Sequence, residues 1–279
     1  MFVLEEWAAP RRVALEAFLA ELFQDSWPGP FGAMGRYPLL TGGKRIRPLL
    51  TLAAHEAITG TWEPAMRPAA AIEMVHCYSL VHDDMPCMDD DAERRGKPTT
   101  HVAFGENMAL LVGDALLTEA FRILSRPWGD PAVQLKLVEE LSTAAGYHGM
   151  IGGQAADLGA LGEITDVETL TRLHRGKTGA LIRCAVRMGA ITARADWEVL
   201  DSLTRYANCV GLAFQLQDDL LDEEQDAGED GPPSFVKLLG AEDTRRRARA
   251  VAEEALRAID GIDSPVLRGL ASFSVERAI

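Results

Sequence analysis

The sequence predicts an all-α protein folded as a single large helical bundle. Apolar residues recur at three- and four-residue intervals along most of the chain, and no run of two-residue alternation is long enough for a sheet. No segment repeats at a fixed period. With 279 residues, 47% of them hydrophobic, the chain can build one sizeable core. We therefore expect one domain that spans residues 1–279.

The first helix is predicted by an apolar stripe near the N-terminus. The residues of this stripe are Val13, Ala14, Ala17, Phe18 and Leu22. Residues 27–43 are rich in glycine and proline, so we expect a long loop there. Another helix should begin near Arg47 and Pro48, because proline fits the first turn of a helix.

The remainder of the chain is predicted to be helical almost throughout. Residues 69–81 are apolar on nearly every side, which indicates a helix buried inside the bundle. Helical spacing continues in five stretches, at residues 105–125, 131–150, 166–191, 196–225 and 241–258. The acidic, turn-rich segment 223–233 predicts a solvated loop.

Charge and cysteine usage exclude several classes of protein. The net charge of −14 disfavours nucleic acid and anionic membrane surfaces as partners. No apolar run approaches the ~20 residues of a membrane span, and no secretory signal is readable, so we expect a cytoplasmic protein without integral membrane association. No cysteine has a zinc-type spacing, and buried or half-buried free thiols are expected at Cys77, Cys87, Cys184 and Cys209.

Two clusters of aspartates follow strongly apolar helical sequence. The first spans residues 83–91, and the second spans residues 218–222. A single cluster of this kind is more typical of a solvated helix end. Two clusters at the ends of buried helices repel their own charges unless cations lie between them. Oxygen ligands without His or Cys favour magnesium, or else manganese, over zinc.

The spacing within each cluster sets a geometric requirement. Asp218 and Asp222 are four residues apart and share one helix face. Asp83 and Asp89 are six apart, roughly 600° around an ideal helix, so they would point in different directions. Pro86 cannot continue a helix without losing a backbone hydrogen bond. We therefore expect the helix to break near Pro86 if both aspartates serve one metal ion.

Cations are grouped separately from the carboxylates. Residues 42–48 read Gly-Gly-Lys-Arg-Ile-Arg-Pro, and Arg94 and Arg95 follow the first acidic cluster. Either group alone is more typical of surface charge, although arginine matches phosphate oxygens bidentately. A chain with both kinds of cluster can hold one diphosphate through metal ions and another through bare cations. This asymmetry suits a reaction in which only one diphosphate leaves.

Taken together, these motifs resemble the trans-polyprenyl diphosphate synthase family, of the bacterial farnesyl/geranylgeranyl (geranyltranstransferase-like) type. The matching stretches, in the family order between about residues 42 and 222, are Gly-Gly-Lys-Arg-Ile-Arg-Pro, Ser-Leu-Val-His-Asp-Asp-Met-Pro-Cys-Met-Asp-Asp-Asp, Arg-Arg-Gly-Lys-Pro-Thr-Thr-His, Gly-Met-Ile-Gly-Gly-Gln, Lys-Thr-Gly-Ala-Leu-Ile and Phe-Gln-Leu-Gln-Asp-Asp-Leu-Leu-Asp. The resemblance implies an isoprenoid-synthase bundle around a central cavity, and a homodimer.

The resemblance also implies a role for each matching residue. The grip on isopentenyl diphosphate is matched by Lys44, Arg47, His76 and Arg95, and the contact with the allylic diphosphate by Arg94. The two metal-binding motifs are matched by Asp83, Asp84, Asp89, Asp218, Asp219 and Asp222. Residues that line the allylic site and the developing cation are matched by Lys177, Thr178 and Gln215, with a lesser role for Gln154 and Asp157. Without the resemblance, His76 is more typical of a helix core and Lys177 of a helix surface.

The implied reaction joins isopentenyl diphosphate to an allylic diphosphate, either dimethylallyl or geranyl diphosphate. Three magnesium ions would stabilise the leaving diphosphate, where negative charge develops, with Asp83 and Asp218 among the catalytic groups. The double bond of isopentenyl diphosphate then attacks the allylic cation, and the released pyrophosphate takes the proton. Water must be excluded, because it would quench the cation.

Product length is predicted from the residues one turn before the first aspartate. Tyr78 and Ser79 lie five and four residues before Asp83, and a bulky Tyr78 beside a small Ser79 resembles the farnesyl pattern. Tyr78 fits ordinary core packing equally well, and Met74 is another candidate for the stop. Geranylgeranyl and geranyl diphosphate synthases therefore remain alternatives.

One position departs from the family pattern. Pro232 stands where the family usually has a lysine that helps to hold the allylic diphosphate, and Lys237 is a candidate substitute. The loss of that contact leaves a catalytically weak regulatory subunit as an alternative. A terpene cyclase is disfavoured, because a cyclase has no use for a second diphosphate grip.

Overall fold

The computed structural model describes residues 2–23, 29–160, 162, 164–225 and 233–276. Its helices are α1 (Leu4–Leu22), α2 (Phe31–Leu39), α3 (Ile46–Thr59), η1 (Glu63–Ala65), α4 (Met66–Asp83), α5 (Thr100–Phe104), α6 (Glu106–Ser125), α7 (Pro131–Ala145), α8 (Met150–Ala155), η2 (Ala156–Ala160), α9 (Val167–His174), η3 (Arg175–Gly179), α10 (Ala180–Thr192), α11 (Trp197–Gln225), α12 (Phe235–Leu239), α13 (Ala241–Ala258) and α14 (Pro265–Glu276). The short strands β1 (Glu93–Arg94) and β2 (Lys97–Pro98) pair as an antiparallel hairpin. The predicted all-α class is therefore confirmed.

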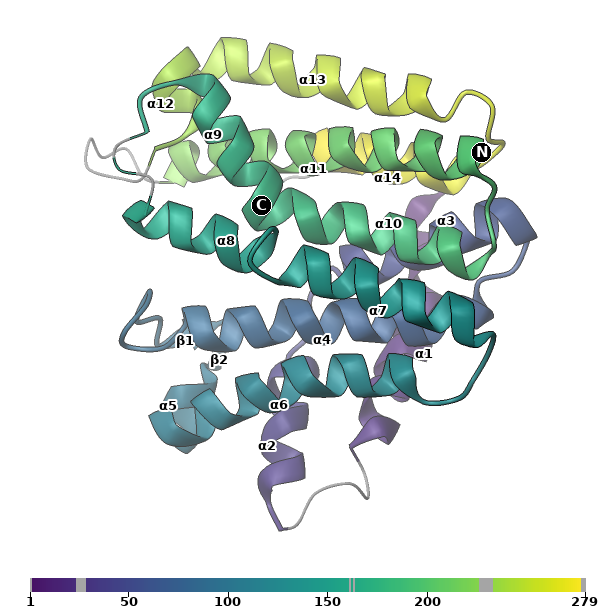
Figure 1. Ribbon diagram of the computed structural model, residues 1–279. Coiled ribbons are helices and arrows are strands. Elements are labelled where there is room, and N and C mark those ends of the chain that lie inside the picture. Colours follow the sequence, from purple (N-terminus) through teal and green to yellow (C-terminus); the bar gives the residue numbers. More distant parts are fainter. Residues whose placement is uncertain (1, 24–28, 161, 163, 226–232, 277–279) are drawn as a thin grey trace.

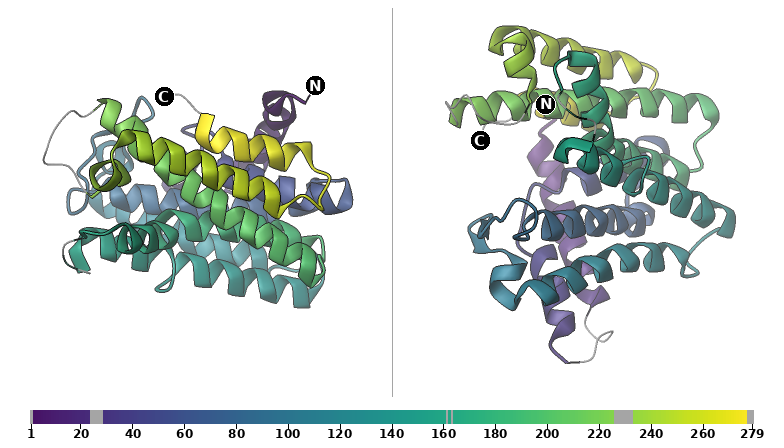
Figure 2. Two further views of the ribbon diagram at one scale, coloured as in Figure 1. Left: turned by 90° about the horizontal axis from the view of Figure 1, so that it is seen from above. Right: turned by 60° about the vertical axis from the view of Figure 1, so that its left-hand side comes forward.

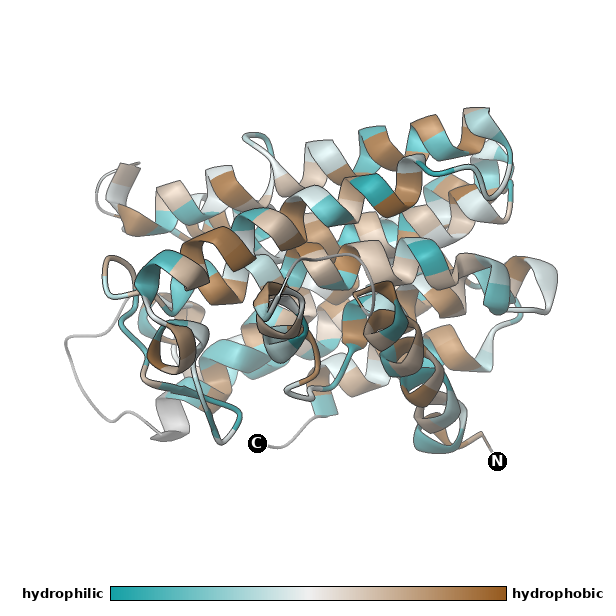
Figure 3. Cartoon of the chain, turned by 90° about the horizontal axis from the view of Figure 1, so that it is seen from below, coloured by the Kyte–Doolittle hydropathy of each residue, from teal (hydrophilic) through white to brown (hydrophobic). Residues whose placement is uncertain are grey.

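The long helices are stacked from α13 through α11, α10 and α4 to α6 (Figure 1). On one side of the bundle, α11, α13 and α14 pack against one another, as Figure 2 also shows. Helix α4 lies inside, between α3, α6 and α10. Seen from below, the helices carry apolar turns beside hydrophilic ones (Figure 3), as expected where one face of each helix is buried.

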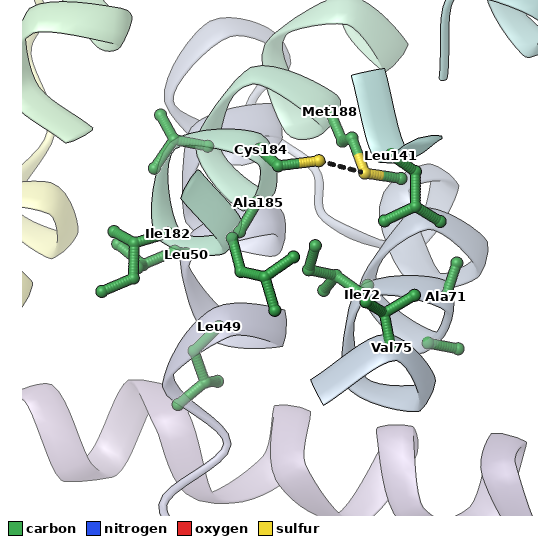
Figure 4. Packing of buried hydrophobic residues seen from close by; sticks show 14 of the residues in the cluster. Leu49, Leu50, Ala71, Ile72, Val75, Leu141, Ile182, Cys184, Ala185 and Met188 are labelled. Atoms are coloured by element: carbon green, nitrogen blue, oxygen red, sulfur yellow. Dashed lines mark hydrogen bonds between the residues drawn. The ribbon is translucent and has the colours of Figure 1, made fainter. Parts of the chain in front are cut away.

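The core is built where α3, α4, α7 and α10 meet (Figure 4). Ile72 and Val75 of α4 are fully buried, and Leu50 and Ala185 join them from α3 and α10. Small residues allow close helix packing here: a Cβ on Gly189 of α10 would lie 2.2 Å from a backbone oxygen of α3. This close packing joins α10 to α3, and α4, which carries the first acidic motif, packs against both.

Most predicted helices are confirmed, with bounds close to those expected. Residues 105–125, 196–225 and 241–258 correspond to α6, α11 and α13. The stretch 166–191 is present as the consecutive segments α9, η3 and α10, and α4 contains the buried stretch 69–81. The stretch 131–150 is interrupted after Ala145, where a turn separates α7 from α8.

The expected loop over residues 27–43 is wrong, because it contains α2. Two of its glycines, Gly32 and Gly35, are buried, and Pro38 lies in its last turn. The helix packs against α4 and α6. Tertiary packing overrides weak local helix propensity at this point.

The predicted stripe of the first helix is also wrong in part. Val13 is 69% exposed, and the buried residues of α1 are Trp7, Ala8, Leu15 and Leu19. Val13 lies two residues, about 200°, away from Leu15 around the helix, so both cannot face the core.

Two smaller expectations need correction. Cys87 is exposed, while Cys77 and Cys184 are buried and Cys209 is half-buried; all four thiols are free, as predicted. The acidic segment starts as helix, since α11 runs to Gln225, and residues 226–232 lie outside the described residues. Within the described chain, no helix is long and apolar enough to cross a membrane.

Candidate active site

The first acidic motif begins where α4 ends. The helix stops at Asp83, three residues before Pro86, and tight turns follow. The Asp89 amide donates to the Asp83 carbonyl at 2.8 Å, which bridges the six-residue interval. The predicted break in the helix is thus confirmed, and the chain folds back so that Asp89 lies beside the helix end.

Asp83 is held from a second helix. Gln154 Nε2 of α8 donates to Asp83 Oδ1 at 2.9 Å. Burial raises the pKa of Asp83 to about 6, Lys177 lowers it, and Asp89 raises it. Asp83 therefore lies within electrostatic range of both the rest of its own motif and η3.

Asp84 points into a different environment. Its carboxylate is buried and accepts a hydrogen bond from Arg94 Nε at 2.6 Å, and Arg94 also bonds Asp91 at 2.9 Å. Arg94 is fixed by the β1–β2 hairpin, in which Arg95 and Gly96 form the turn with positive φ values of 55° and 74°. Asp84 is thus ion-paired with Arg94, and no such pair with Arg94 is formed by Asp83 or Asp89 in the described residues.

The second acidic motif lies on α11, as expected. Asp219 is buried and accepts from Gln215 Nε2 at 2.9 Å and from the Phe235 amide at 2.6 Å. Burial raises the pKa of Asp219 to about 6 against these hydrogen bonds, and Asp218 and Asp222 raise it further. Asp219 thus holds α12 against α11, and Asp218 and Asp222 lie on the same helix as Asp219.

Residues from η3 connect the two motifs. Thr178 Oγ1 donates to Gln215 Oε1 at 3.1 Å. Lys177 forms an ion pair with Asp157 of η2, and of the neighbouring charges Lys177 lowers the pKa of Asp83 the most. The predicted residues Lys177 and Thr178 of η3 therefore connect the acidic end of α4 to Gln215 and the acidic part of α11.

Glycine makes this arrangement possible, a role that the sequence analysis missed. A Cβ on Gly153 of α8 would lie 2.2 Å from the Lys177 backbone nitrogen, and one on Gly211 of α11 would lie 3.1 Å from Gly179 Cα. The backbones of α8 and η3 therefore approach too closely for any side chain at Gly153, and η3 and α11 approach closely at Gly211. The Gly152-Gly153 pair was the available signal.

The basic residues gather around His76. Burial lowers the pKa of His76 well below its ordinary value, and Arg47 and Arg95 lower it further. Arg47 Nε is buried and has no hydrogen-bond partner in the described part of the chain. Asp218 raises the pKa of Arg47 against the larger effect of burial, so the basic group lies near the second acidic motif.

Two further basic residues, Arg45 and Lys44, have other partners in this structure. The Arg45 side chain is completely buried and pairs with Glu73 at 2.7 Å, so it serves the fold. Lys44 is exposed, and its ammonium lies 5.9 Å from the centroid of the Phe273 ring of α14. There Lys44 lines a pocket of about 560 Å³ between α1, α3 and α14.

The residues predicted to set product length lie in α4. Tyr78 is 5% exposed, with its ring edge-to-face on His82 at 5.7 Å. Burial raises the pKa of Tyr78 to about 12, with a further contribution from Asp83. Ser79 Oγ bonds the His76 carbonyl, and Met74 is fully buried one turn deeper.

The carboxylates only partly resemble a preformed metal centre. Among the residues described, no group of three or more His, Cys, Asp or Glu side chains is close enough to hold an ion. Asp84 and Asp219 already bond protein groups. The oxygen-only donor set fits a hard divalent cation, as do the burial and the repulsion from Asp89 and Asp84 that raise the pKa of Asp83.

Comparisons with known proteins agree with this geometry. The family model described as polyprenyl synthetase matches residues 30–235. Farnesyl diphosphate synthase of Escherichia coli is 42% identical over 98% of this chain and 97% of its own length. The chloroplastic geranylgeranyl pyrophosphate synthase 11 of Arabidopsis thaliana is 43% identical over 82% of this chain and 69% of its own. The crystal structure of an FPP/GFPP synthase from Zymomonas mobilis superposes with a TM-score of 0.90 at 40% identity, covering 98% of both chains.

Proposed function

Because this chain belongs to the polyprenyl synthetase family and is a trans-prenyltransferase, we propose that it joins isopentenyl diphosphate to dimethylallyl and then geranyl diphosphate, releasing farnesyl diphosphate and pyrophosphate. One observation carries the proposal. The acidic end of α4 and the acidic part of α11 are joined through η3, with Lys177 near Asp83 and Thr178 bonded to Gln215. Carboxylates and a lysine in one region suit a diphosphate with bound cations.

Magnesium, or else manganese, would be held by Asp83 and Asp89 at the end of α4 and by Asp218 and Asp222 of α11. The bound ions would stabilise negative charge on the departing diphosphate. Asp84 and Asp219 act as supports, because their carboxylates bond Arg94 and the Phe235 amide. Asp84 and Asp219 thereby fix the positions of the neighbouring carboxylates that would hold the ions.

The two diphosphates are proposed to bind differently. Arg94 and Lys177 contact the allylic diphosphate, while Arg47, His76 and Arg95 hold isopentenyl diphosphate. His76 stays neutral among these arginines and so can donate one ring N–H to a phosphate oxygen. Lys44 joins the grip by turning away from Phe273.

The reaction breaks the allylic C–O bond and forms a carbon–carbon bond with the double bond of isopentenyl diphosphate. The Thr178 hydroxyl and the Gln215 amide oxygen lie where they can stabilise positive charge. The carbocation that results from the new carbon–carbon bond loses a proton to form a double bond, and the released pyrophosphate accepts this proton. Buried surroundings such as Tyr78 and Met74 keep water away from the cation.

Farnesyl diphosphate is proposed as the product because the bulky, buried Tyr78 lies five residues, just over one helical turn, before Asp83. In Tyr78→Ala the cavity deepens, so the main product should lengthen to twenty carbons or more. Chromatography of the dephosphorylated products measures this, with His82→Ala as the control for loss of the packing partner. Unchanged product length in Tyr78→Ala would contradict the assignment and favour Met74 as the stop.

A homodimer in the cytoplasm is part of the proposal and rests on the family. The alternative is a weakly active regulatory subunit, and the residue that favours it, Pro232, lies outside the described residues. Incubation of the purified chain with magnesium, isopentenyl diphosphate and each primer separates the two. Turnover to a fifteen-carbon product that EDTA abolishes supports the synthase. No turnover with any primer supports the regulatory subunit, and hydrocarbon from an allylic diphosphate alone would indicate a cyclase.

A further inference from the structure

His174, the last residue of α9, is a buried side chain that the proposed chemistry does not use. It is 8% exposed, and neither Nδ1 nor Nε2 has a hydrogen-bond partner among the residues described. The ring lies against Phe235 of α12, with 5.4 Å between the centroids. A buried polar group without a partner destabilises the fold, and an apolar ring would pack there without this cost. The nitrogens of His174 therefore need a different explanation.

Two charged groups act on the ring. Asp157 of η2 raises the pKa of His174 and Lys177 of η3 lowers it, while burial has the largest effect and brings it to about 4. The ring is thus neutral near pH 7 and keeps one N–H donor. Asp157 and Lys177 are ion-paired with each other. Asp157 therefore lies within electrostatic range of two donors and bonds one of them.

The proposed function, on which this inference rests, gives Lys177 a second partner. An allylic diphosphate carries more negative charge than one carboxylate and would draw the ammonium away from Asp157. Asp157 is exposed as a residue, with 30% of its side chain accessible, and would then lose its charge-assisted bond. The loss weakens the contact between η2 and η3 unless another donor replaces the lysine.

We propose that His174 is a positioning residue that replaces Lys177 on Asp157 when the allylic diphosphate binds, by donating its ring N–H to the freed carboxylate. The exchange keeps η2 and η3 together after the ion pair opens. It also connects the allylic site to the second acidic motif, because the Phe235 ring packs on His174 and the Phe235 amide bonds Asp219. The ring N–H of His174, which has no partner among the described residues of the free enzyme, would thus find its acceptor only when the allylic diphosphate is bound.

The test is ring nitrogen spectroscopy on the full-length protein labelled with ¹⁵N-histidine. The chain has six histidines, and His174→Phe assigns the resonance. With inorganic pyrophosphate and magnesium as the probe, the protonated nitrogen of His174 should move downfield, as a new hydrogen bond requires. The movement should disappear in Asp157→Ala. A resonance that stays in place while calorimetry reports pyrophosphate binding would overturn the exchange, as would an equal movement in Asp157→Ala.

Kinetics supply a second readout. His174→Phe keeps the packing on Phe235 and removes the donor, so the KM for the allylic diphosphate should rise about tenfold, the effect of one hydrogen bond to a charged group. The KM for isopentenyl diphosphate should change less than about twofold, and the Tm of the free enzyme should not fall. His148→Phe is the matched control, an exposed histidine whose ring packs edge-to-face on Tyr147. A lower Tm with both KM values raised would indicate a merely structural ring.

Calorimetry with the wild-type protein separates the two proposals. Absence of pyrophosphate binding in the presence of magnesium would overturn the proposed function and this inference together. Binding without a change at His174 would overturn the inference alone.

Discussion

The two acidic motifs have nearly the same composition, yet the chain organises them by different means. On α11 the helix period alone places Asp218 and Asp222 on one face, with Asp219 turned inward. At the end of α4 the helix must stop, and a backbone bond from Asp89 to Asp83 restores the alignment. In both motifs one inward aspartate, Asp84 or Asp219, bonds an arginine side chain or a backbone amide. In the proposed function these two aspartates support the carboxylates that hold the cations.

The largest loss of activity is expected when Asp83, a proposed ligand of the divalent ions, is replaced. Asp83→Ala should lower kcat/KM by about 10³-fold, because charge stabilisation of the leaving group is lost. The free energy of unfolding in EDTA should not fall by more than ~1 kcal/mol, because removal of a half-buried carboxylate with a raised pKa offsets the loss of the Gln154 bond. Steady-state kinetics and urea unfolding measure the two effects. Asp201→Ala, on the remote part of α11, is the control.

The supporting aspartate should respond in the opposite way. Asp219→Ala leaves the Phe235 amide and Gln215 without their acceptor, so unfolding should become easier by about 1–3 kcal/mol. The loss of kcat/KM should be smaller, on the order of 10- to 100-fold, because the neighbouring carboxylates remain. A stability loss in Asp83→Ala as large as in Asp219→Ala would remove the distinction between the two kinds of aspartate.

The connection between the motifs can be broken at a glycine. Gly153→Ala puts a Cβ 2.2 Å from the Lys177 backbone nitrogen, so α8 and η3 must separate. Overpacking of this kind costs about 1–3 kcal/mol, and we expect activity to fall at least tenfold because Gln154 and Lys177 shift together. Thermal unfolding and kinetics measure both effects. Gly129→Ala, where a Cβ meets no atom within 4 Å, should change neither.

The smallest effect is a pH dependence that both motifs share. Burial raises the pKa values of Asp83 and Asp219 from 3.8 to about 6, so the folded state binds protons more tightly than the unfolded chain. Their contribution to stability is complete below about pH 4 and is lost as the pH rises through 6. In EDTA the free energy of unfolding should therefore fall by about 1 kcal/mol per group over this window, after solvent screening. Denaturant unfolding between pH 4 and 7 measures it, and a flat profile would show that the carboxylates are not desolvated.

Sequence reasoning was most successful where a local rule decides the structure. Helix spacing located α6, α11 and α13 closely, and the proline rule located the break after Asp83. It failed at α2, where packing against α4 and α6 outweighs the glycines. No local rule could distinguish Arg45 from Arg47, because the difference depends on Glu73, 28 residues further along the chain.

The motifs named the residues of the proposed site, but not the pairings among them. Asp83, Lys177 and Gln215 came from three separate motifs, and the structure brings these motifs into one region. The bond from Gln154 to Asp83 spans 71 residues and depends on how closely α8 approaches η3. Contacts of this kind follow from helix packing, which periodicity does not specify.

The central claim is that both acidic motifs serve one pyrophosphate through shared divalent ions. Anomalous diffraction from crystals grown with manganese and inorganic pyrophosphate tests it most directly. The account predicts manganese within about 2.5 Å of carboxylate oxygens from both Asp83 and Asp218, on a single pyrophosphate. Manganese bound at only one motif, or at two motifs with no pyrophosphate between them, would contradict the claim.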